Sequence, residues 1–135
     1  ALTMVFVIGM AIFLSRYDFA DITTSFTEEN GGRVQVRVAA ADERDSFYVD
    51  EITEIELLEN YPRMSKNNGY DGTVYNIGAF NVSGYGKCRT YVCLKTKPAI
   101  ILRTQDKTYL WNDESEAGTR ELYDRLVEAC GNGVQ

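Results

Sequence analysis

The sequence predicts a mainly β domain of the α+β class, with about seven short strands followed by one C-terminal helix. Short runs rich in β-branched and aromatic residues alternate with turn formers over residues 22–112. Behind them, apolar residues recur at spacings of three and four, which is typical of an amphipathic helix. A chain of 135 residues accommodates one such domain and can bury a core without disulfides.

The first half of the chain begins with a predicted β-hairpin. Residues 22–27 and 33–40 are β-rich and flank the turn formers of residues 30–32. Valines at alternate positions of the second run indicate a strand with one buried and one exposed face. Residues 42–45 are expected to form an acidic loop.

Two further strands and a polar segment follow this hairpin. Residues 46–49 and 52–58 are predicted as strands, and residues 73–77 resume β structure. Residues 61–72 between them contain Pro62, two asparagines and two glycines. So many turn formers predict irregular structure.

Residues 84–112 predict a meander of three strands, at 87–94, 99–104 and 108–112. Side chains alternate along a strand. In the first strand one face therefore carries Cys88, Thr90, Val92 and Leu94, and the other carries Lys87, Arg89, Tyr91 and Cys93. The two cysteines face opposite ways and cannot bridge each other, and three cysteines are an odd number, so no disulfide framework is expected.

A helix is predicted after Asn112. Asp113 or Ser115 can cap its start, and glycines at 131 and 133 are expected to end it. Its apolar stripe consists of Leu122, Leu126, Ala129 and Cys130.

Residues 1–14 are apolar at every position except Thr3 and Gly9. As a helix they span about 21 Å, less than the roughly 30 Å of a bilayer core. Either they are a core element of the domain, or they are the end of a transmembrane helix, which a first residue other than methionine favours. We expect the second: an apolar segment at 1–19, outside the fold, and a domain at 20–135 that is membrane-associated on the cytoplasmic side.

Charge and composition exclude several functions. The net charge of −6 argues against nucleic-acid binding, which needs a basic footprint. The absence of histidine removes the common catalytic triads and zinc sites, so we expect no enzyme, no metal site and no cofactor. Gly86-Lys87 fails as a phosphate loop, because that motif needs glycine at position 81 and serine or threonine at 88.

Positive charge is concentrated in residues 63–107, where basic residues outnumber acidic ones. We expect several of these cations to share an outer face of the meander, and they form the candidate binding site together with Tyr91. The candidate residues are Lys87, Arg89, Tyr91, Lys95, Lys97 and Arg103. Such a face either rests on anionic lipid or is paired with the acidic strands of the first half.

Aromatic residues are also dense in the second half of the chain. They either line a groove for a partner or pack in the core. The residues concerned are Tyr70, Tyr75, Phe80, Tyr85, Tyr91, Tyr109 and Trp111.

Five segments resemble the bacterial pleckstrin-homology-like (PH-like) domains of small membrane proteins of unknown function. They are FYVDEITEIEL, the polar loop with Arg63 and Asn68-Gly69, IGAFNVSGYGKCRTYV, PAIILRTQDKTYLWN and GTRELYDRLVEA. The resemblance implies a partly open barrel of two antiparallel sheets that is capped by the helix. Residues 27–32 are acidic where phosphoinositide-binding relatives carry basic residues, so that ligand is not expected at its usual site.

The resemblance also implies a non-enzymatic, membrane-anchored module for protein or peptide interaction or scaffolding. An exposed sheet edge or an aromatic groove would supply the contact, and self-association is compatible with it. The alternative is a module that senses a ligand or anionic lipid through the basic face of residues 84–107.

Overall fold

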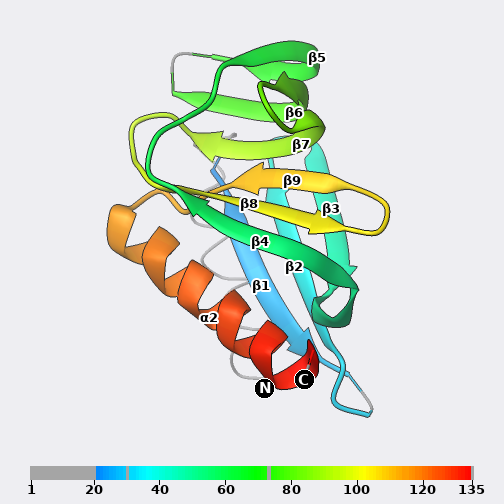
Figure 1. The fold of residues 1–135 in the computed structure, drawn as a ribbon. Helices are drawn as coiled ribbons and strands as arrows, with labels where there is room; N and C mark the ends of the chain where they lie inside the picture. Colours follow the sequence, from blue (N-terminus) through cyan, green and yellow to red (C-terminus); the bar gives the residue numbers. More distant parts are fainter. Residues whose placement is uncertain (1–20, 30, 73, 135) are drawn as a thin grey trace.

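The computed structural model describes residues 21–29, 31–72 and 74–134, which fold into two β-sheets and one long helix (Figure 1). Sheet A has the order β1-β2-β3 and sheet B the order β4-β8-β9-β7-β6-β5. The strands are β1 (Thr23–Glu28), β2 (Val34–Ala40), β3 (Glu43–Tyr48), β4 (Ile52–Leu58), β5 (Met64–Asp71), β6 (Tyr75–Val82), β7 (Gly86–Cys93), β8 (Ala99–Thr104) and β9 (Thr108–Trp111). The 3-10 helix η1 (Val49–Glu51) links the sheets, and α2 (Glu116–Val134) follows β9.

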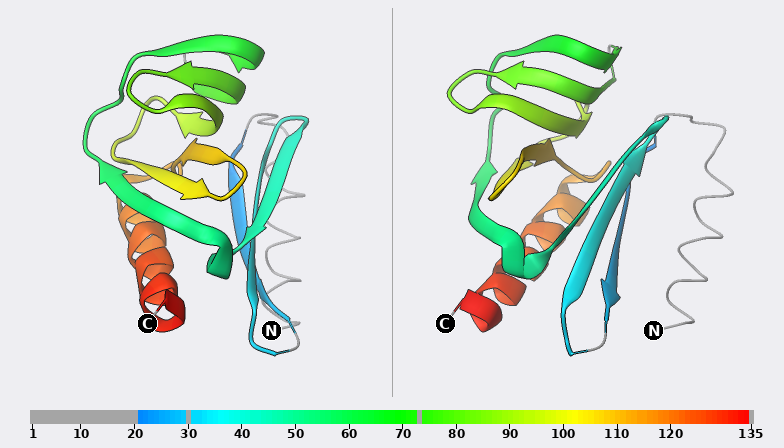
Figure 2. Two further views of the ribbon diagram at one scale, coloured as in Figure 1. Left: turned by 45° about the vertical axis from the view of Figure 1, so that its right-hand side comes forward. Right: turned by 90° about the vertical axis from the view of Figure 1, so that its right-hand side faces the viewer.

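The predicted class, mainly β with a C-terminal helix, is confirmed, and the hairpin β1-β2 forms where expected. Sheet B curls without closing (Figure 2), because β4 and β5 remain at its two ends. Its strands pair antiparallel except β7 and β9, which are parallel. The meander prediction is therefore wrong in its order: β9 inserts between β8 and β7.

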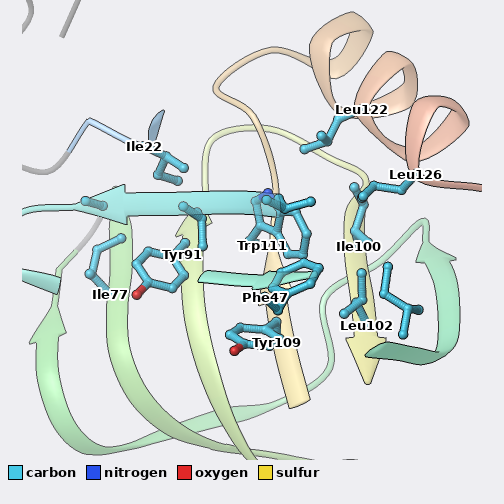
Figure 3. Packing of buried hydrophobic residues seen from close by; sticks show 14 of the residues in the cluster. Ile22, Phe47, Ile77, Tyr91, Ile100, Leu102, Tyr109, Trp111, Leu122 and Leu126 are labelled. Atoms are coloured by element: carbon cyan, nitrogen blue, oxygen red, sulfur yellow. The ribbon is translucent and has the colours of Figure 1, made fainter. Parts of the chain in front are cut away.

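The main core lies between sheet B on one side and sheet A and α2 on the other (Figure 3). Trp111 of β9 is fully buried at its centre, beside Phe47 of β3 at 6.0 Å between ring centroids. Leu122 and Leu126 bring α2 onto the same core. Ser115 is the helix cap, since its Oγ accepts the backbone N–H of Gly118 at 3.0 Å.

A second cluster of buried residues occupies the other face of sheet B. It contains Cys88, Val92 and Ile101, whereas Tyr91 and Cys93 belong to the main core. The alternation predicted along β7 is therefore confirmed. Cys88 and Cys93 face opposite cores and are free thiols.

Three local predictions are wrong. Residues 42–45 are not a loop, because β3 begins at Glu43. Residues 61–72 are not irregular, because they contain β5, which pairs with β6 around a bulge. The helix does not end at Gly131 but continues to Val134, since glycine weakens a helix by only about 1 kcal/mol.

The predicted apolar anchor at residues 1–19 lies outside the described residues. Among the helices of the described part, none is long and apolar enough to cross a membrane.

Candidate binding grooves

A groove of about 540 Å³ lies between the start of β7 and the β8–β9 turn. We call it the lysine groove, because the exposed residues Lys87 and Lys107 belong to its lining. Its lining consists of Ala79, Lys87, Cys88, Arg89, Thr104, Gln105, Asp106, Lys107 and Thr108.

Arg89, which also lines this groove, is held by carboxylates of sheet A. Its Nε donates to Oδ2 of Asp45 at 2.8 Å, and its second guanidinium nitrogen donates to Oε1 of Glu43 at 2.5 Å. Lys107 Nζ reaches the other oxygen of Asp45 at 3.2 Å, and the Tyr91 hydroxyl also donates to Asp45. One carboxylate thus joins β3 of sheet A to β7 and to the β8–β9 turn of sheet B.

The protonation states of this cluster follow from these contacts. Burial tends to raise the pKa of Asp45, but hydrogen bonds from Tyr91, Arg89 and Lys107 outweigh it and hold the pKa below its usual value. Burial, reinforced by the hydrogen bond to Asp45, raises the pKa of Tyr91. Asp45 is therefore charged and Tyr91 neutral near pH 7, as in a structural ion pair.

The six candidate residues from the sequence do not form one face. Lys87 and Arg89 line the lysine groove. Arg103 lies on the opposite face of sheet B, two residues from Ile101 of the second cluster. Alternation predicts which residues share a face within one strand, but it does not relate the faces of two strands. Whether a residue of β8 shares a face with a residue of β7 depends on how both strands pair with β9, which lies between them.

Lys95 and Lys97 are exposed between β7 and β8, where Lys97 Nζ donates to Oδ1 of Asn60 at 3.2 Å. The expectation that Tyr91 faces outward is wrong: it is 0% exposed. Sheet A covers it, and its hydroxyl is directed to Asp45.

A second groove, of about 420 Å³, lies beside β4 and β8. We call it the glutamate groove. It is lined by Glu54, Ile55, Glu56, Tyr85, Ile101 and Arg103. Arg103 Nε lies 3.6 Å from Oε2 of Glu54, and its guanidinium carbon lies 5.8 Å from the centroid of the Tyr85 ring.

Most of the dense aromatic residues pack in the core. Phe80, Tyr91, Tyr109 and Trp111 are buried, whereas Tyr85 lines the glutamate groove. The structure does not describe the side chain of Tyr70. A groove lined by the whole series is therefore not formed.

Sequence reasoning missed Glu43 and Asp45. Both lie in the acidic loop predicted at residues 42–45. In the structure Glu43, Asp45 and Phe47 are alternate residues of β3 and share its inward face. The spacing of two residues between Glu43, Asp45 and Phe47 could have predicted this shared face. Acidic residues do not suggest a buried face, because they are rarely buried without a partner.

Cys88, which lines the lysine groove, is not activated as a nucleophile. Burial raises the pKa of the Cys88 thiol to about 11, which keeps it protonated. Among the residues that the structure describes, no three histidine, cysteine or acidic side chains are grouped to hold a metal ion.

A family model described as bacterial PH domain matches residues 27–113, which is more than half of the chain. This span runs from β1 through β9 and ends before α2. Neither the curated proteins nor the solved structures contain a match.

Proposed function

Because the chain belongs to the bacterial PH domain family, we propose that it is a non-enzymatic interaction module that binds a protein or peptide partner. PH domains are generally non-catalytic. The contact is assigned to the lysine groove, where exposed Lys87 is available to the partner.

The observation that carries this proposal is that carboxylates of sheet A already neutralise two basic residues of the lysine groove. Asp45 binds both Arg89 and Lys107, whereas Arg103 is only loosely paired with Glu54. An anionic membrane attracts a protein by about 1 kcal/mol per free basic residue at its surface, so paired cations contribute little. The lysine groove offers an ammonium, an amide at Gln105 and a carboxylate at Asp106, a mixture that suits peptide groups.

We further propose that residues 1–19 anchor the module in a membrane and that the domain lies on the cytoplasmic side, where it acts as a scaffold. The support is the apolar character of residues 1–14. Self-association through β5 is less favoured, because a bulge and the exposed Lys66 guard its edge.

Anionic-lipid sensing is the second candidate function. The observation in its favour is the exposure of Lys87, Lys95 and Lys97, which pair with no carboxylate in the described part of the chain.

The proposal is tested with a photo-crosslinking amino acid at Gln105 in the full chain, expressed in bacterial cells. We expect one discrete crosslinked protein, and its loss when Lys87→Glu is added. The matched control places the crosslinker at the exposed Glu121 of α2. Equal crosslinking from both positions would contradict a specific partner.

Vesicle sedimentation separates the two candidate functions. The full chain and its Lys87→Glu, Lys95→Glu, Lys97→Glu triple variant should sediment equally with phosphatidylglycerol and phosphatidylcholine vesicles. Binding that requires phosphatidylglycerol and is lost in the triple variant would support lipid sensing instead.

A further inference from the structure

We propose that the glutamate groove binds a basic side chain, arginine or lysine, of a partner peptide. The inference rests on the proposed function only in taking a peptide as the occupant. The glutamate groove shares no lining residue with the lysine groove, so the two sites are tested separately.

The groove has the surfaces that a long basic side chain requires. Its lining includes the apolar side chain of Ile101, which is 4% exposed, and the aromatic side chain of Tyr85. The methylene stem of arginine or lysine packs on such apolar surface, and its cation is attracted to an aromatic face. Glu54 and Glu56 supply carboxylates at the rim.

The chain's own Arg103 shows that these groups accept a guanidinium. It occupies the groove loosely, at 5.8 Å from the Tyr85 ring centroid and 3.6 Å from the Glu54 carboxylate. Arg33, elsewhere in the chain, is held more closely. Its guanidinium carbon lies 3.7 Å from the centroid of the Tyr48 ring, and its Nε lies 2.7 Å from Oδ2 of Asp50.

The loose pair is also open to solvent, because the side chains of Arg103 and Glu54 are 38% and 68% exposed. An exposed ion pair at this distance contributes little to stability. An incoming cation can therefore displace Arg103 from Glu54 and from the Tyr85 ring at little cost.

The lining of the groove also has an excess of negative charge. It contains two carboxylates and one guanidinium, and Glu56 forms no ion pair with any described residue. Adding one cation balances the lining. Glu56 helps to raise the pKa of the Tyr85 hydroxyl, after burial, which agrees with the close approach of the two groups.

The test titrates N-acetylargininamide into the isotope-labelled full chain in zwitterionic detergent and follows backbone amide shifts by NMR. We expect saturable shifts at residues 54–56, 85 and 101–103, with a dissociation constant in the millimolar range typical of so small a ligand. The uncharged isostere N-acetylcitrullinamide should bind at least about threefold more weakly.

Two substitutions give effects of opposite sign. Glu56→Gln should weaken binding about two- to fivefold, because it removes the unpaired carboxylate. Arg103→Ala should strengthen binding by a similar factor, because it removes the internal competitor. Two control substitutions lie at exposed positions outside the groove. Glu121→Gln changes the net charge as Glu56→Gln does, and Lys95→Ala changes it as Arg103→Ala does. Both controls should leave the affinity unchanged.

Three results would overturn the inference: no saturable shift at these residues, equal binding of the citrulline compound, or equal effects of the groove and control substitutions. The Gln105 crosslink reports on the proposed function independently. Loss of arginine binding with the crosslink retained removes this site alone, whereas loss of the crosslink with arginine binding retained removes the assignment of the lysine groove.

Discussion

Replacing Asp45 by asparagine should lower the free energy of unfolding by about 2–3 kcal/mol. The Asp45 side chain is 6% exposed and accepts hydrogen bonds from Arg89, Lys107 and Tyr91. Breaking a buried ion pair costs about 3–5 kcal/mol. The expected cost is lower here, because Arg89 keeps Glu43 at 2.5 Å and the Lys107 side chain is half exposed.

Trp111 is the single tryptophan and is fully buried, so its fluorescence reports urea unfolding directly. With a denaturant slope of about 1.5–2 kcal/mol/M, the midpoint of Asp45→Asn should fall by roughly 1.5 M. The matched control is Asp50→Asn, which removes an equally short contact to Arg33 between half-exposed side chains. Its midpoint should stay close to that of the wild type, and equal shifts for the two variants would refute the role of burial.

The same substitution carries a pH signature. The folded-state pKa of Asp45 is lowered relative to its ordinary value of 3.8, so its stabilising contribution is complete above that value. The contribution is lost as the pH falls through the lower folded pKa. The difference between wild type and Asp45→Asn should therefore be constant from pH 5 to 7 and shrink below about pH 4.

Three further substitutions test the fold. Asn112→Ala should cost about 3 kcal/mol in urea unfolding, because the buried amide accepts the Cys93 N–H at 2.9 Å and donates to the Tyr61 hydroxyl at 2.6 Å; a loss below 1 kcal/mol would contradict this. Gly78→Ala would place a methyl group 2.5 Å from a carbonyl oxygen of β5, so hydrogen exchange should speed up in β5 but not in β8. Gly84→Ala, also at positive φ but with open space around it, should not loosen β5. Ser115→Ala should lower the stability by about 1 kcal/mol through loss of the helix cap, measured as a lower Tm; an unchanged Tm would rule out that role.

Much of the architecture follows from local sequence patterns. The alternating valines of β2 and the two faces of β7 appear in the structure as predicted, because the side-chain period of a strand is a property of the backbone itself. The cap and apolar stripe of α2 are local in the same sense.

The candidate site was only partly predictable. Lys87 and Arg89 were expected together and do line one groove. Tyr91 was assigned to the surface because nothing in β7 indicates that β3 covers it. Residues 61–72 are predicted to be irregular but contain β5, because β6 pairs with this segment. Gly69 lies opposite Gly78, and the lack of side chains at both positions lets the two backbones approach closely.

Local sequence patterns predict which residues of one strand share a face, where the hairpin of sheet A turns and where the helix begins. Tertiary packing settles which of the two faces is covered. It placed β9 between β7 and β8, put Arg89 and Arg103 on opposite faces of sheet B, and turned Asp45 inward to Arg89. The two differ in the sequence separation of the interactions involved. Alternation depends on neighbouring residues, whereas burial and ion pairing depend on strands that are distant in sequence.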